Sequence, residues 1–164
     1  MSRSLLNVFI GLVLVVMAGC GFQLRGDVPL PDNLKVMYIQ GINIQSGMGL
    51  ELKRSLKQNG IHVVNNYEKG SALLTILENT YERRVLSVGN NAKVNEYELY
   101  GSLQFKVTDD QGKLIVEPFK VQAIRDYQFD QTQVLSSDGE EAFLREQINQ
   151  QLIDSVLRRL SAIK

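Results

Sequence analysis

The sequence is poor in the residues that build metal, redox and disulfide sites. Its 164 residues include one cysteine, Cys20, and one histidine, His62. A single cysteine cannot form a disulfide within the chain, and a single histidine cannot supply the histidine pairs of many zinc sites. The sequence also lacks a CxxC pair, a glycine-rich phosphate loop and a GxSxG motif. Chemistry that depends on these motifs is therefore not expected, and His62 is expected to be structural.

An excess of charge of one sign is absent too. Lysine and arginine together number 18, as do aspartate and glutamate, so the formal net charge at pH 7 is zero. A nucleic-acid-binding surface normally requires an excess of positive charge, so no nucleic-acid partner is expected. Carboxylates are plentiful, and an acid pair such as Glu96 and Glu98 is the one remaining route to glycoside cleavage. Adjacent charges on an exposed strand are ordinarily solvated, and we favour that interpretation.

The amino-terminal segment is apolar but short. Residues 5–17 contain one polar residue, Asn7, and follow the basic Arg3. A helix needs about 20 apolar residues to cross a bilayer core, and this stretch is shorter. A basic start, a short apolar stretch and small residues before a break are typical of a secretory signal peptide. We therefore expect residues 1–19 to be removed from the mature protein.

Cys20 determines the kind of signal peptide. Met17, Ala18 and Gly19 run directly into it and resemble a bacterial lipobox, in which leucine is more usual at the position of Met17. In that chemistry the cysteine thiolate takes up diacylglycerol and the new amino terminus is acylated. Two or three acyl chains anchor a protein stably. Gly21 replaces the aspartate that retains lipoproteins in the inner membrane, so we expect an outer-membrane anchor facing the periplasm and no other cofactor.

The mature chain is expected to comprise a lipidated tether, residues 20–33, and one domain, residues 34–164. Prolines in the tether favour extended conformations of the residues before them. The domain is long enough to bury a core without disulfides.

Two segments have the apolar periodicity of an amphipathic helix. The first, residues 46–60, has a capping residue at its start, Ser46, and Gly60 at its end, where Ile61 can make the hydrophobic contact that follows a glycine cap. The second runs from about 138 to 161. Its apolar positions are Leu144, Ile148, Leu152, Val156 and Leu160.

The remaining regular segments have the pattern of strands. Those before the hairpin lie at 34–40, 61–65 and 72–88. A long hairpin follows, with its turn at the sequence DDQG, residues 109–112. Its first strand carries on one face Tyr97, Leu99, Leu103, Phe105 and Val107. Its return strand carries on one face Ile115, Phe119, Val121, Ala123, Tyr127 and Phe129. Pro118 lacks a backbone donor, which predicts an edge position or a bulge for the return strand.

A single apolar face on the hairpin predicts that both helices pack on the same side of the sheet. The expected fold class is α+β, with two helices on one face of a roughly four-stranded mixed or antiparallel sheet, a two-layer sandwich. The other face of the sheet is expected to be polar and open.

The order of these features resembles the LptE family of lipopolysaccharide-assembly lipoproteins. The most specific part is CGFQLRG at residues 20–26; VPLP, LKVMYIQ, a helix, a hairpin containing NEYEL (residues 95–99) and a closing amphipathic helix follow. The resemblance covers the whole mature chain. It implies a fold of two helices on a four-stranded sheet. It also implies a plug inside the large outer-membrane β-barrel LptD, which assists assembly of the barrel and export of lipopolysaccharide to the outer leaflet, and binds lipopolysaccharide.

The resemblance also implies basic residues near the phosphates of lipopolysaccharide. The basic positions of the family correspond here to Asn90 and Ser137, and neither is charged. The nearest basic residues are Arg83, Arg84 and Lys93, which become the candidate lipopolysaccharide-binding residues. The alternative is that they are solvated strand ends.

On the polar sheet face, Glu98, Gln104 and Lys106 are the candidate contacts with the barrel. An enzyme is not expected. Two other functions stay open: a different outer-membrane lipoprotein scaffold, in barrel assembly or peptidoglycan attachment, and a lipid-anchored periplasmic hydrolase.

Overall fold

The computed structural model describes residues 34–163 apart from residue 91 and residues 130–133, and describes only the backbone of residues 134–138. The expected signal peptide, the lipidated Cys20 and the tether lie outside the described residues. Within the described ranges, no helix combines the length and apolar character needed to cross a membrane.

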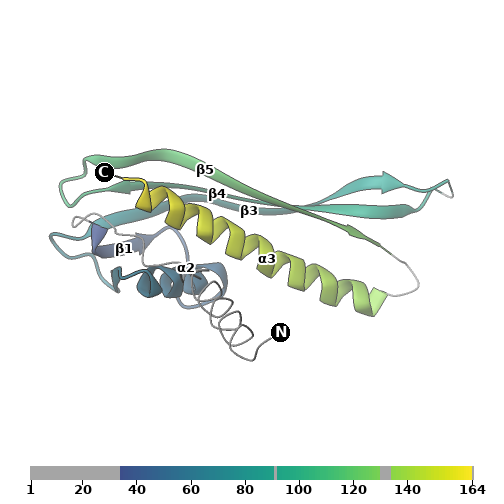
Figure 1. Cartoon of the computed structure of the whole chain (residues 1–164), viewed down its shortest axis with the longest axis horizontal. Helices are drawn as coiled ribbons and strands as arrows, with labels where there is room; N and C mark the ends of the chain where they lie inside the picture. Colours follow the sequence, from purple (N-terminus) through teal and green to yellow (C-terminus); the bar gives the residue numbers. More distant parts are fainter. Residues whose placement is uncertain (1–33, 91, 130–133, 164) are drawn as a thin grey trace, which may run out of the picture.

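The domain has two layers, a mixed five-stranded sheet and a pair of helices (Figure 1). The strands are β1 (Val36–Gln40), β2 (His62–Val64), β3 (Ala72–Val88), β4 (Val94–Thr108) and β5 (Leu114–Gln128), in the spatial order β2-β1-β3-β4-β5. Strand β1 is parallel to β2 and β3, whereas β3, β4 and β5 form an antiparallel meander. The predicted α+β class is confirmed. The sheet has five strands rather than about four because the three-residue β2 adds to its edge.

The helices α2 (Gly47–Gln58) and α3 (Val134–Ser161) cover the same face of the sheet, as the single apolar face predicted (Figure 1). Helix α3 begins earlier than the expected start near residue 138. Its fully or almost fully buried side chains are Ile148, Leu152, Ile153, Val156 and Leu160. The helix lies directly on β4 at Gly101, where an added Cβ would collide with Ile148. The missing side chain of Gly101 therefore sets how closely α3 approaches the sheet.

The carboxyl-terminal end of α2 has the glycine cap that the sequence predicted. Gly60 has φ +80°, which favours glycine, and its N–H donates to the Lys57 carbonyl at 3.1 Å. The Ile61 N–H donates to the Leu56 carbonyl at 3.1 Å, which completes a Schellman motif. The start differs from the prediction: Ser46 is the N-cap residue, but its side chain makes no capping hydrogen bond. Gly47 is left-handed, φ +53°, so the first turn lacks the geometry in which that side chain reaches a helical N–H.

The β4–β5 hairpin contains both features predicted for it. In the turn, the Asp109 carboxylate accepts hydrogen bonds from the backbone N–H groups of Gln111 and Lys113, at 2.9 and 2.8 Å. Strand β5 lies at the sheet edge, and its register with β4 shifts beside Pro118.

The same bulge corrects the predicted face of β5. Because the register shifts at the bulge, Val116 rather than Ile115 lies opposite Val107 and is 2% exposed. Phe119 pairs with the buried Phe105, so it lies on the predicted face, where it is 39% exposed. Ile115 is only partly buried. The predicted face holds for Val121, Ala123 and Tyr127, which are all buried.

The sheet has two halves with different surroundings. Strand β1 pairs with β3 only as far as Thr75, so β3 is a free edge beyond it. We call β3 from Tyr81, β4 up to Gly101 and β5 from Ala123, which are paired with one another, the distal half of the sheet. The rest of the sheet is the proximal half. The distal half extends past β1 and α2, and of the two described helices only α3 runs beneath it (Figure 1).

Candidate functional site

The sheet face opposite the helices, which we call the open face, is mainly polar; Ile124, which pairs with Tyr100 and is 47% exposed, is an apolar exception. On β4, Leu99, Leu103 and Phe105 are fully buried against the helices. Successive side chains of a strand point to opposite faces, so Glu98, Gln104 and Lys106 point to the open face. The structure thus places the three candidate barrel contacts on one surface. Their contact with a barrel stays a prediction.

Ion pairs and aromatic contacts fix the positions of several side chains on the open face. Arg84 pairs with Glu82, Nη2 to Oε2 at 2.7 Å, and with Glu98, Nη1 to Oε1 at 3.5 Å. The guanidinium of Arg84 also lies 4.1 Å from the centroid of the Tyr100 ring. The Gln122 amide donates to the Tyr100 hydroxyl at 2.5 Å. These contacts join all three strands of the meander across the open face.

A second polar cluster lies on the helix side of the distal half. Its centre is Glu141 of α3, whose Oε2 pairs with Arg83 Nη1 at 3.0 Å and accepts a hydrogen bond from the Tyr127 hydroxyl at 2.9 Å. Arg83 also lies 4.7 Å from the centroid of the Tyr97 ring, which stacks on Tyr127 at 5.7 Å. Burial and the hydrogen bond to Glu141 raise the pKa of Tyr127 to about 12. We call Arg83, Tyr97, Tyr127 and Glu141 the distal clamp, because they tie α3 to the hairpin.

The structure does not bring the candidate lipopolysaccharide-binding residues together. Arg83 belongs to the distal clamp on the helix side, whereas Arg84 lies on the open face. Lys93 lies in the β3–β4 loop, where its carbonyl accepts a hydrogen bond from the Gly89 N–H at 2.8 Å. Period-two alternation along a strand already separates Arg83 from Arg84. Binding of lipopolysaccharide by these residues stays a prediction.

Apolar side chains are exposed near the same loop. Val85, Leu86 and Val88 are 54%, 49% and 57% exposed. Leu86 lies at a register shift between β3 and β4, which interrupts the alternation of faces. The end of the distal half therefore offers apolar surface beside charged residues.

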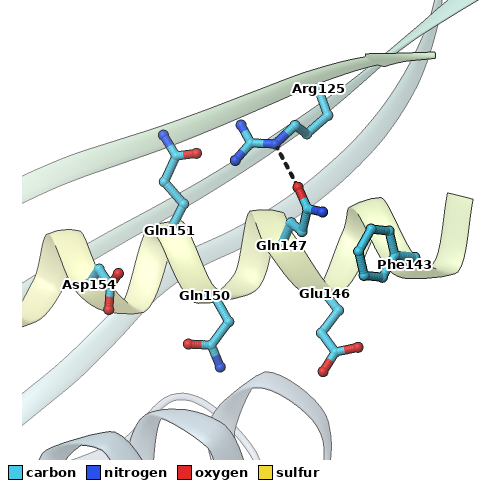
Figure 2. Close-up of a pocket in the computed structure, with 7 residues that line it drawn as sticks. All are labelled: Arg125, Phe143, Glu146, Gln147, Gln150, Gln151 and Asp154. Carbon is cyan, nitrogen blue, oxygen red and sulfur yellow. Dashed lines mark hydrogen bonds between the residues drawn. The ribbon is translucent and has the colours of Figure 1, made fainter. Parts of the chain in front are cut away.

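The described pockets do not resemble a catalytic cleft. Figure 2 shows one of about 540 Å³ between β5 and α3, in which Arg125 Nε donates to Gln147 Oε1 at 3.2 Å. Its other lining residues are Phe143, Glu146, Gln150, Gln151 and Asp154. Over the described ranges, no group of three or more histidine, cysteine or acidic residues could hold a metal ion.

The carboxylates considered as an acid pair have other partners. Glu96 accepts a hydrogen bond from the Ser87 hydroxyl at 2.7 Å, and Glu98 pairs with Arg84. His62 is exposed on the short edge strand β2, away from both. The arrangement of these residues favours a surface for contact over a site for acid–base chemistry.

The fold and these surfaces define a class of protein: a two-layer α+β domain with an extended meander whose polar face is left open. A family model described as lipopolysaccharide-assembly, LptE, matches residues 33–160. The chain belongs to the LptE family, as the sequence features predicted.

Individual relatives agree with this assignment. The LPS-assembly lipoprotein LptE of Photorhabdus laumondii is 22% identical over 163 residues, which cover 99% of this chain and 88% of that protein. Two solved structures are similar in fold. Lipoprotein B of Nitrosomonas europaea gives a TM-score of 0.72 at 27% identity, over 87% of this chain and 91% of that one. A minor lipoprotein of Acinetobacter baumannii gives a TM-score of 0.67 at 28% identity, over 82% and 94%.

Proposed function

We propose that this chain is an outer-membrane lipoprotein that plugs an LptD-type barrel, assists its assembly and supports export of lipopolysaccharide to the outer leaflet, without catalysing a reaction. Membership of the LptE family supports involvement in lipopolysaccharide assembly. The observation that carries the finer proposal is the open face, where Glu98, Gln104 and Lys106 lie along one strand. The interior of an outer-membrane barrel is polar, so a polar sheet face is suited to pack against its wall.

The dimensions of the domain agree with a plug. Strand β3 has 17 residues, which at about 3.3 Å per residue gives a length of roughly 55 Å. The hydrocarbon core of a bilayer is about 30 Å thick, so the meander is long enough to extend through it inside a barrel. A compact sphere of this many residues would be roughly 38 Å across, and the domain is longer than that along β3 and therefore narrower across it. The plug proposal takes a barrel of roughly 22 strands or more, which would admit such a sphere, since strands about 4.8 Å apart and tilted by about 40° set the circumference.

The anchor proposed for the domain is the lipid on Cys20, with the protein facing the periplasm and the barrel lumen. Cys20→Ser tests it because a serine hydroxyl is a far weaker nucleophile than a thiolate. In cells fed a clickable palmitate analogue, the natural chain is expected to take up label and the serine variant to take up none. Label on the serine variant would refute the proposed anchor.

Photocrosslinking tests the plug. A crosslinking amino acid is placed in the full chain at Glu98, Gln104 or Lys106 in living cells, with Lys57 on the exposed side of α2 as the comparison position. We expect the open-face positions to capture a large outer-membrane barrel in higher yield than Lys57. Capture of small soluble proteins alone, or of a barrel of about 16 strands or fewer, would refute the plug. Capture of peptidoglycan-attachment proteins would favour the scaffold alternative.

A further inference from the structure

A pocket on the helix side of the sheet belongs to neither surface of the proposed function. It lies between the start of α2, α3 and the facing parts of β3 and β4, and has a volume of about 480 Å³. Gly47 and Met48 of α2, Asn79 and Tyr81 of β3, and Arg145 and Asn149 of α3 are among its lining residues. Four of these six residues, Asn79, Tyr81, Arg145 and Asn149, have polar side chains.

The hydroxyl of Tyr81 is buried and has no hydrogen-bond partner among the described residues. A buried hydroxyl without a partner is unfavourable and rare in folded proteins. Burial, followed by the negative charge of Glu141, raises the pKa of Tyr81, so the phenol keeps its proton at neutral pH. Tyr81 therefore has an unused hydrogen-bond donor at the wall of the pocket. Because this hydroxyl is buried, a ligand oxygen accepts from it only after the surrounding side chains move.

Arg145 provides a positive charge at the same place. Its guanidinium lies 4.3 Å from the centroid of the Tyr81 ring, and it makes no hydrogen bond or ion pair with the rest of the described chain. Glu141, one helical turn earlier, lies on the same side of the helix, and its Oε2 is engaged by Arg83 and Tyr127. The planar fork of an arginine matches the oxygens of a phosphate, so the donors of Arg145, which no other described side chain engages, are suited to an oxyanion.

We propose that this pocket binds a phosphate group, with Arg145 and the Tyr81 hydroxyl as its donors and the amides of Asn79 and Asn149 beside them. The start of α2 adds no opposing charge, because its first turn contains no acidic residue. The volume exceeds that of a phosphate, which leaves room for an attached sugar. The phosphate could belong to a lipid headgroup or be free. The assignment to a lipid headgroup rests on the proposed function, whereas the phosphate-binding pocket does not.

Calorimetric titration of the full chain in detergent at low salt tests the pocket. The probes are inorganic phosphate, glucosamine 1-phosphate and unphosphorylated glucosamine. We expect both phosphates to bind and glucosamine not to bind. Arg145→Gln should weaken phosphate binding by about tenfold or more, and Tyr81→Phe, which removes only the hydroxyl, by about threefold to tenfold.

Arg159→Gln is the matched control. Arg159 lies 4.8 Å from the Phe119 ring centroid, a similar arginine–aromatic contact outside the pocket, so this variant should bind as the natural chain does. Tighter binding of glucosamine 1-phosphate than of inorganic phosphate would identify a sugar headgroup as the ligand, and equal binding a free phosphate. The absence of binding at millimolar phosphate, or an equal loss in Arg145→Gln and Arg159→Gln, would overturn the inference. Photocrosslinking from the open face tests the plug independently, so failure of the pocket and failure of the proposed function can be told apart.

Discussion

The proximal and distal halves of the sheet share the same strands but are stabilised in different ways. In the proximal half, both helices cover the sheet, and Leu74, Phe105 and Val107 are completely buried. In the distal half α3 is the only helix among the described residues, and Val85 and Val88 of β3 are more than half exposed. There the contact between helix and sheet depends on the distal clamp, with Glu141 joining Arg83 and Tyr127.

The difference shows that an alternating strand does not create a core by itself. Burial of apolar surface contributes about 25 cal/mol per Å², and this contribution is concentrated where two helices are available to cover the sheet. The distal half gains less from burial and more from hydrogen bonds and ring stacking. We therefore expect it to open locally at a lower free energy than the proximal half.

The largest effect is expected in the proximal core. Leu152→Asp places an unpaired charge at a position that is 1% exposed, and should lower the free energy of unfolding by several kcal/mol. The control is Gln150→Asp on the exposed side of the same helix, which should change it by about half a kcal/mol or less. Chemical unfolding of the full chain in detergent measures both. Equal losses would contradict the assignment of the helix faces.

A smaller and more local effect is expected in the distal clamp. Glu141→Gln keeps the shape of the side chain but removes its charge, and should lower stability by about 1 kcal/mol, because Arg83 is half exposed and screened by solvent. Hydrogen exchange should quicken at Tyr97 and Tyr127 and stay unchanged at Phe105. The exposed neighbour Glu140 provides the control variant, Glu140→Gln. Uniform acceleration along the meander would show that the two halves open together.

Alkaline pH should weaken the same clamp. The pKa of Tyr127 is about 12 in the folded state against 10.0 for an ordinary tyrosine, so its contribution is complete below pH 10 and is lost as the pH rises toward 12. Between pH 9 and pH 11 the loss is about 1 kcal/mol. The measurement compares unfolding free energies of the natural chain and Tyr127→Phe at both values. The free energy of unfolding of Tyr127→Phe should fall less between these pH values than that of the natural chain. Equal falls in the two proteins would contradict the role of Tyr127.

The smallest effect is expected on the open face. Glu96→Ala removes a partly exposed carboxylate and its hydrogen bond from Ser87, and should change stability by about half a kcal/mol. Thermal unfolding of Glu96→Ala and Leu152→Asp under the same conditions compares the two losses of stability directly. A loss of several kcal/mol would mean that the open face is part of the structural core.

Much of the fold could be predicted because local patterns determine it. The span of β3, the burial of Leu99, Leu103 and Phe105, and the glycine cap of α2 follow from periodicity and from Gly60. Pro118 predicted an irregular edge strand, but it could not show that the bulge turns Val116 into the core, because that depends on the register with β4.

The candidate site was less accessible to sequence reasoning. The charge of Arg83 predicts a binding residue, but its partner Glu141 lies 58 residues away in the sequence and comes near because α3 crosses beneath the hairpin. The angle of that crossing is a tertiary property. Likewise, the position of Arg145 over Tyr81 joins a helix and a strand that are far apart in sequence.

Gly101 also gives α3 a pivot. The helix approaches β4 closely where Ile148 lies over this glycine, and its amino-terminal end at Val134 is about 21 Å further along the axis at 1.5 Å per residue. With the pivot fixed, a tilt of about 5° there displaces the far end of the helix by about 2 Å. Glu141 lies in the part of α3 between this pivot and the amino-terminal end. Its hydrogen bonds tolerate changes in length of only a few tenths of an ångström. A side chain at residue 101 would therefore tilt the helix and weaken contacts far from residue 101 itself.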